Sequence, residues 1–130
     1  MKSGKELEHE QLTDKIIGCA IEVHKKLGPG FMESVYENAF IIELQKRGLP
    51  FVKQKEVLIE YDGIEVGKHR LDLFVADTIV VELKTVKNIE DIHFAIVRSY
   101  LRALGKDHGL LINFSKKILE VKRVICKKIS

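Results

Sequence analysis

RLDLFVADTIVVELK, residues 70–84, predicts two short apolar strands joined by a tight turn. Side chains alternate between the two faces of a strand, so Glu82 and Lys84 share one face of the second strand. With Asp77 at the centre of the turn, Asp72 and Glu82 each lie five residues away and face each other across the hairpin. The Cβ atoms of such opposed residues are roughly 4.5–5.5 Å apart. The hairpin therefore brings two carboxylates and a lysine to one face.

These charged residues lie within strands that are apolar on both faces, as a buried strand normally is. Two buried carboxylates at that separation repel each other, and each isolated buried charge costs several kcal/mol. A divalent cation removes the repulsion, and Mg²⁺ or Mn²⁺ prefers carboxylate oxygens. Such an ion lowers the pKa of a water and polarises a phosphoryl oxygen, and Lys84 can orient that water. The alternative is an amphipathic strand that carries a solvated salt bridge.

Two motifs together resemble a known family. Asp72, followed ten residues later by Glu82-Leu83-Lys84, is similar to the signature of the PD-(D/E)XK nuclease superfamily. GFMESVY at residues 30–36 matches the GxxExxY pattern of a small family within that superfamily. The surrounding words LGPGFMESVYENAF, HRLDLFV, VVELKTV and GLLINFS also resemble that family, and the resemblance extends over residues 12–123.

The resemblance implies a metal-dependent nuclease that hydrolyses nucleic-acid phosphodiester bonds, with DNA as the expected substrate. Asp72 and Glu82 would hold Mg²⁺ or Mn²⁺, with the backbone carbonyl of Leu83 as a further ligand. Lys84 would position the water, and Glu33 of the GxxExxY motif would extend toward the metal as a further catalytic carboxylate. Many nucleases of this kind dimerise to cut both strands, so a homodimer is also an expectation.

Three helices are expected from the spacing of apolar residues: residues 12–27 with Thr13 as N-cap, residues 32–47, and a third from Asn88 to Leu104 that ends at Gly105. Glu33 and Tyr36 share a face of the second helix, and Glu33 lies in the first turn, where the helix dipole favours an anion. Glu33 is therefore either a site residue or only a helix-start carboxylate. Tyr36 is expected to pack with its hydroxyl near the site, where it can contact substrate.

Strands are expected at residues 51–61, 64–69 (continuing into the hairpin), 109–114 and 118–125, the last of which also fits a helix. This order predicts an α/β fold, a mixed central sheet flanked by helices, which agrees with the restriction-endonuclease-like core of the resemblance. Gln54 falls where related sequences carry a glutamine, and Arg70 belongs to a basic approach to Asp72 that can hold a substrate backbone. For both, the alternative is a solvated residue. Counting outward from Asp77, the centre of the hairpin turn, also predicts that Arg70 pairs with Lys84.

His93, Ile96 and Tyr100 share one face of the third predicted helix. In the family that this chain resembles, the face typically reads His, Gln, Tyr, so Ile96 replaces a polar group. His93 and Tyr100 are candidates for substrate binding, with plain packing as the alternative. The departure at Ile96 supports a second hypothesis, a catalytically weakened module that binds nucleic acid or protein on the same fold.

Composition sets the remaining expectations. The 130 residues, 45% hydrophobic and 32% charged, predict one globular domain with a loose segment at residues 1–10, and the resemblance implies that this domain is nuclease-like. No apolar run approaches the ~20 residues of a membrane span, and no secretory signal is present, so the expected location is the cytoplasm without membrane partners. Cys19 and Cys126 fit no metal-ligand spacing and are expected to be reduced. A net charge of +3 permits a polyanionic partner without requiring one.

Overall fold

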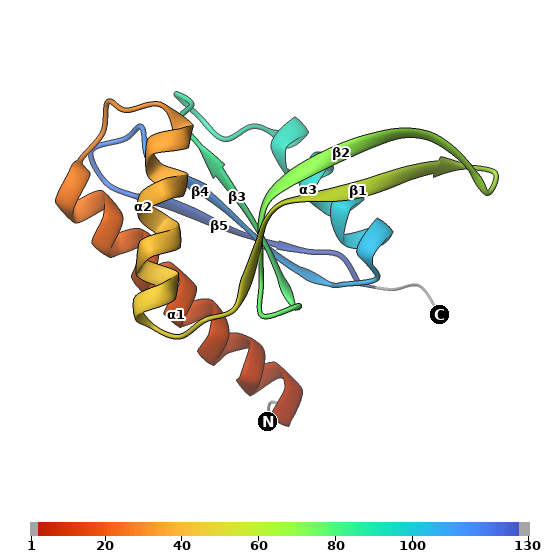
Figure 1. Ribbon diagram of the computed structural model, residues 1–130, viewed down its shortest axis with the longest axis horizontal. Coiled ribbons are helices and arrows are strands. Elements are labelled where there is room, and N and C mark those ends of the chain that lie inside the picture. Colours follow the sequence, from red (N-terminus) through yellow and green to blue (C-terminus); the bar gives the residue numbers. More distant parts are fainter. Residues whose placement is uncertain (1–2, 128–130) are drawn as a thin grey trace.

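A mixed sheet forms the middle of a three-layer structure (Figure 1). The computed structural model describes residues 3–127. Within them the strands are β1 (Phe51–Tyr61), β2 (Ile64–Val75), β3 (Ile79–Lys84), β4 (His108–Asn113) and β5 (Glu120–Ile125). They lie side by side in the order β1-β2-β3-β4-β5, with β3 and β4 parallel and the other neighbours antiparallel. This is the mixed α/β sheet that the order of elements predicted, and the segment that fitted either a strand or a helix forms β5.

The helices are α1 (Gly4–Leu27), α2 (Glu33–Lys46) and α3 (Asp91–Leu104). The predicted start of α1 was wrong, because Ser3 caps the helix by accepting a hydrogen bond from the Glu6 amide at 3.2 Å. Thr13 lies inside α1, where its hydroxyl donates to the His9 carbonyl. Residues 4–10, expected to be loose, form the first turns of α1; they are mostly polar and carry no apolar stripe. Met1 and Lys2 lie outside the described residues.

The start of α3 also differs from the prediction. Glu90 rather than Asn88 is the N-cap, and its backbone amide donates to Nδ1 of His93 at 2.8 Å. The helix ends as expected at Gly105, whose φ of 67° lies in the left-handed region that glycine adopts without strain. The ring of His93 is therefore tied to the first turn of α3.

Two apolar clusters fill the spaces on either side of the sheet. α1 and α2 cover one face, where Ala20 and Phe40 pack with Leu73, Val81 and Ile112. α3 covers the other face through a second cluster, which contains Val80, Val97, Leu101 and Leu111. β3 is buried from Ile79 to Leu83, which confirms the expectation of a strand buried on both faces.

The structure also bears on the thiols and on membrane crossing. Cys19 and Cys126 are both free thiols, as expected. Within residues 3–127, no helix combines the length and apolar character needed to cross a bilayer.

Candidate active site

The β2–β3 hairpin has the register that its turn predicted. Leu73 pairs with Val81, and Val75 pairs with Ile79, which places Asp72 opposite Glu82. In the described part of the chain, the backbone ladder between β2 and β3 ends at the Leu73–Val81 pair. The distal part of the β1–β2 hairpin then curves away from the rest of the sheet (Figure 1).

This divergence overturns the predicted pairing of Arg70 with Lys84. Arg70 pairs instead with Glu56 of β1 and is exposed, whereas Lys84 pairs with Asn113 of β4. Counting residues outward from the turn assumes that the two strands stay hydrogen-bonded side by side along their length, and here they separate. The acidic pair lies where they separate.

The two carboxylates replace the backbone hydrogen bonds that the ladder lacks at this point. Glu82 Oε1 accepts a hydrogen bond from the Asp72 amide at 2.8 Å, and Asp72 Oδ2 accepts one from the Leu83 amide at 2.8 Å. Each acid is thus fixed by the main chain of the opposite strand. One oxygen of each carboxylate therefore serves the sheet.

Burial makes this pair electrostatically unfavourable without a cation. Glu82 is only 6% exposed, and burial, together with the neighbouring Asp72, raises its pKa to about 8. Burial also raises the pKa of Asp72, although hydrogen bonds from the Leu83 amide and Gln54 and the charge of Lys84 oppose the increase. At neutral pH the pair therefore favours retaining a proton or binding a cation in its place.

Gln54 lies beside the pair in an unusual backbone conformation. Its neighbours in β1 pair with Leu71 and Leu73, so it occupies the position across from Asp72. Its φ is 51°, a left-handed value that costs a residue other than glycine about 1–2 kcal/mol. Its side chain hydrogen-bonds the Asp72 carboxyl and donates to Glu37 Oε1 at 2.6 Å. Gln54 therefore links the acidic pair to α2.

Two further acids come from the start of α2. Burial raises the pKa of Glu33 above its ordinary value. The positive charge of Lys84 acts against this increase, and the negative charges of Asp72 and Glu37 add to it. Glu33 is thus close enough to the acidic pair for its charge to interact with Asp72, and close enough to Lys84 to interact with that residue as well. Glu37 lies one turn later, and its hydrogen bond from Gln54 brings it into the same set.

Lys84 is half-buried at the end of β3, and its charge acts on three carboxyl groups. It lowers the pKa of Glu33, Asp72 and Glu82 alike. A single ammonium group therefore lies among an excess of acids, where it offsets part of their repulsion.

α3 covers the other side of the pair. Burial and the charges of Glu82 and Asp72 raise the pKa of Tyr100 to about 12, so its hydroxyl keeps its proton and can donate. His93 acts on Glu33, whose pKa it lowers. Because Nδ1 of His93 accepts the Glu90 amide, the neutral ring carries its proton on Nε2. Ile96 is half-buried and packs into the apolar cluster under α3.

Two residues expected at the site lie apart from this set. Tyr36 is fully buried; its hydroxyl donates to the Gly28 carbonyl at 2.6 Å, and its ring stacks on Phe114 at 4.4 Å. These contacts give Tyr36 a structural role in the loop between α1 and α2. Arg70 lies on the exposed part of β2, beyond the point where β2 and β3 separate.

Asn113 is a positioning residue that the sequence reading missed. It is fully buried at the end of β4; Oδ1 accepts the Val86 amide at 3.1 Å, and Nδ2 donates to the Val86 carbonyl at 2.8 Å. The segment directly after Lys84 is thereby fixed to β4. The only signal in the sequence is an amide inside the apolar run GLLINF.

The acids do not form a ready-made cage of three carboxylates. Among the described residues, Glu33, Asp72 and Glu82 do not bring one oxygen each to within 4.8 Å of one another. Mg²⁺ requires no such cage, because it keeps several waters and binds through one or two carboxylates. The donor set therefore fits a hard divalent cation held by Asp72 and Glu82.

Comparison with known proteins agrees with this fold and signature. The crystal structure of SSO0001 is similar, with a TM-score of 0.58 and 17% identity over 74% of this chain and 50% of that one. The chain thus spans half the length of SSO0001, and at this identity the likeness concerns the restriction-endonuclease-like fold alone. No curated protein matches the sequence. The family model of the PD-(D/E)XK nuclease superfamily matches residues 10–124, nearly the whole chain, and the chain therefore belongs to this superfamily.

Proposed function

We propose that this protein is a Mg²⁺- or Mn²⁺-dependent nuclease of the GxxExxY type that hydrolyses phosphodiester bonds in DNA. The observation that carries the proposal is the buried pair Asp72 and Glu82, each held by the backbone of the opposite strand beside Lys84. A structural salt bridge would place a cation against each acid, whereas here two acids share one lysine.

Asp72 and Glu82 would hold the ion. A bound Mg²⁺ or Mn²⁺ supplies Lewis acidity toward a phosphoryl oxygen and lowers the pKa of a water. Lys84 offers its ammonium group to the negative charge that develops on phosphorus. Glu33 would accept a hydrogen bond from the attacking water, and Tyr100 would donate one to a phosphate oxygen.

We infer that the rest of the substrate lies along a groove whose lining includes Lys55 and Ser99, the sequence neighbours of Gln54 and Tyr100. It has a volume of about 730 Å³ and lies between β1 and the C-terminal half of α3; two cations, Lys55 and Arg102, and two acids, Glu56 and Glu60, are among its lining residues. Cationic side chains there would contact phosphates independently of base sequence, so binding should weaken as salt concentration rises.

The test is cleavage of plasmid DNA by purified protein in Mn²⁺, compared between two isosteric variants. Asp72→Asn removes one acid of the pair, and Asp77→Asn removes an acid in the turn of the same hairpin, 89% exposed. Loss of a group that stabilises the transition state lowers rates by about 100-fold or more. We expect that loss for Asp72→Asn and full activity for Asp77→Asn. Equal cleavage by the wild type and Asp72→Asn would refute the assignment.

Ile96 favours one competing function, a module that binds nucleic acid without cutting it. An aliphatic side chain packs in the α3 cluster at the position where related sequences carry a polar group. In that case the protein would bind DNA and leave it intact in both Mg²⁺ and Mn²⁺. Replacing Ile96 with Gln separates the two functions, because a weakened nuclease should gain activity from the substitution and a binding module should not.

A further inference from the structure

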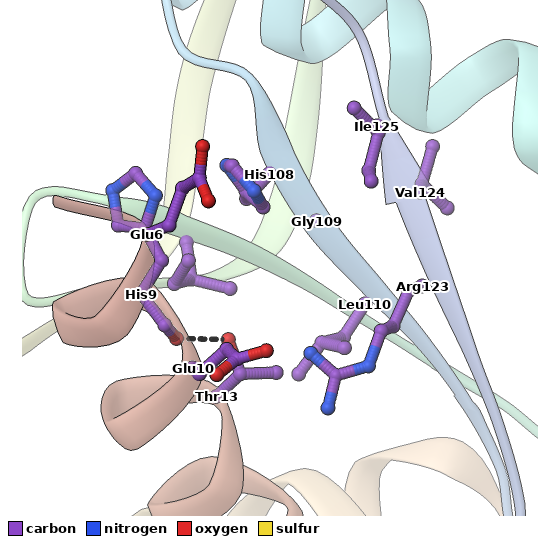
Figure 2. Close-up of a pocket in the computed structure, with 11 residues that line it drawn as sticks. Glu6, His9, Glu10, Thr13, His108, Gly109, Leu110, Arg123, Val124 and Ile125 are labelled. Atoms are coloured by element: carbon purple, nitrogen blue, oxygen red, sulfur yellow. Dashed lines mark hydrogen bonds between the residues drawn. The ribbon is translucent and has the colours of Figure 1, made fainter. Parts of the chain in front are cut away.

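A second group of polar side chains lies where α1 passes the beginning of β4. Figure 2 shows Glu6 and His9 extending from α1 toward His108 of β4. They line a cavity of about 360 Å³, together with Glu10, Thr13 and Arg123. The cavity has room for an ion with coordinated water.

This group is separate from the acidic pair. His108 pairs with Ile79 at the first residue of β3, whereas Lys84 pairs with Asn113 at its last. Five residues of strand span about 16 Å. The two groups also lie on opposite faces, because His108 has the same parity as Leu110 in the α1–α2 cluster, while Glu82 has that of Val80 in the α3 cluster.

Two of these side chains, His9 and His108, are arranged as metal ligands together with Asp107, the residue before His108. His9, Asp107 and His108 each bring a ligand atom to within 4.8 Å of the other two, and all three are half-buried. The imidazole rings lie with centroids 4.4 Å apart, and Asp107 Oδ1 is 2.7 Å from Nδ1 of His108. At that separation Asp107 Oδ1 and the unprotonated Nδ1 of His108 can bind the same ion.

The backbone holds these ligands in place from both sides. His108 is part of the β4 ladder with β3 and β5, and the Asp107 carbonyl accepts the Cys126 amide at 3.0 Å. On α1, Glu6, His9, Glu10 and Thr13 follow helical spacing, so they share the face turned to β4. Arg123, which lines the same cavity, is paired with Asp14 at 3.6 Å.

We propose that His9, His108 and Asp107 bind a first-row transition metal, with Zn²⁺ as the reference ion. Imidazole nitrogen suits Zn²⁺, whereas Mg²⁺ and Mn²⁺ favour sites made of carboxylate and water. His9 and His108 are 99 residues apart in the sequence, so the ion would fasten the first turns of α1 to the sheet. Because that arrangement exists only in the folded chain, binding would stabilise the fold.

Zn²⁺ titration followed by thermal unfolding tests the site. At a hundredfold excess over the dissociation constant, a ligand specific to the folded state raises the midpoint of a domain this size by about 10 °C. We expect that rise in the wild type and its loss in His9→Ala and His108→Ala. His69→Ala is the matched control, since His69 is an exposed histidine on β2 and should keep the full response.

A second measurement removes any dependence on unfolding. Co²⁺ bound through imidazole has visible d–d absorption, which can be recorded on the native protein after circular dichroism has verified folding of each variant. The absorption should vanish in His9→Ala and persist in Asp72→Asn, which retains both histidines. Absence of a Zn²⁺ response in the wild type, or an undiminished Co²⁺ spectrum in both histidine variants, would overturn the proposal. A spectrum lost in Asp72→Asn instead would place the ion at the acidic pair.

Discussion

Replacing Glu82 with Gln should make the metal-free protein more stable, although it removes a proposed metal ligand. Gln has nearly the same shape, and its amide oxygen can still accept the Asp72 amide that Glu82 Oε1 accepts at 2.8 Å. What disappears is a negative charge, 6% exposed and next to a second carboxylate. The substitution therefore isolates the electrostatic cost of the pair.

The size of the effect follows from the pKa of Glu82, which is raised from 4.5 to about 8 in the folded chain. Below pH 4.5 the Glu82 carboxyl is protonated in both the folded and the unfolded chain, so it does not lower the free energy of unfolding. Between the two values the unfolded chain releases its proton and the folded chain keeps it, so wild-type stability falls as pH rises. At 1.36 kcal/mol for each pKa unit, the loss above pH 8 has an upper limit of about 5 kcal/mol.

Urea unfolding of both proteins in a chelator measures this difference directly. We expect the free energy of unfolding of Glu82→Gln to exceed that of the wild type by less than about 1 kcal/mol near pH 5 and by several kcal/mol near pH 9. Glu65→Gln, at an acid whose side chain is 47% exposed on β2, should stay within about 0.5 kcal/mol of the wild type at both pH values. Mn²⁺ should raise the stability of the wild type and not that of Glu82→Gln.

Two outcomes would refute this reasoning. A difference between Glu82→Gln and the wild type that does not change with pH would mean that Glu82 ionises normally. A wild type that becomes the more stable protein at high pH would mean that a cationic group, such as Lys84, fully compensates the buried charge. Either result would remove the electrostatic argument for a cation at this pair.

Three further substitutions test the framework around the site by chemical denaturation. Asn113→Ala leaves the Val86 amide without its partner and removes one of the two donors to the Val86 carbonyl, the other being the Ser115 hydroxyl. It should destabilise the fold by about 2–3 kcal/mol, whereas the exposed Asn88→Ala should have little effect. Gly109→Ala places a Cβ 2.8 Å from Val97 Cγ1 and 3.3 Å from the Val80 carbonyl oxygen, and should cost about 1–3 kcal/mol. Gly67→Ala, with open space around it, is the control, and equal effects at the two glycines would contradict the packing of α3 on the sheet. Tyr36→Phe loses the hydrogen bond to the Gly28 carbonyl and should cost about 1 kcal/mol, while Tyr61→Phe, at a residue 70% exposed, should be neutral. If Tyr36→Phe instead left stability intact and reduced DNA cleavage, Tyr36 would be a substrate contact after all.

Local rules were enough to place the acidic pair. The period of 2 along a strand and a turn centred on Asp77 predicted that Asp72 faces Glu82, and the register confirms it. The same rules predicted a β3 buried on both faces and an α3 that ends at Gly105. Each of these features depends on residues within about ten positions of one another, where chain geometry alone constrains the answer.

Helix starts were less predictable, because polar residues give no periodic signal. α1 begins at Gly4 rather than Leu12, and α3 has Glu90 rather than Asn88 as its N-cap. Several residue types can cap a helix, so only the hydrogen bonds actually formed identify the one that does.

What the sequence by itself determined is the chemistry of the hairpin: two acids and a lysine on apolar strands, in a register set by the turn between them. Tertiary structure decided where β2 leaves β3, which separates Arg70 from Lys84 and frees the two amides that the acids accept. It also decided that His9 meets His108. Such contacts depend on how α1 packs on the sheet, and helix packing is governed by the shapes of whole surfaces rather than by the spacing of residues along the chain.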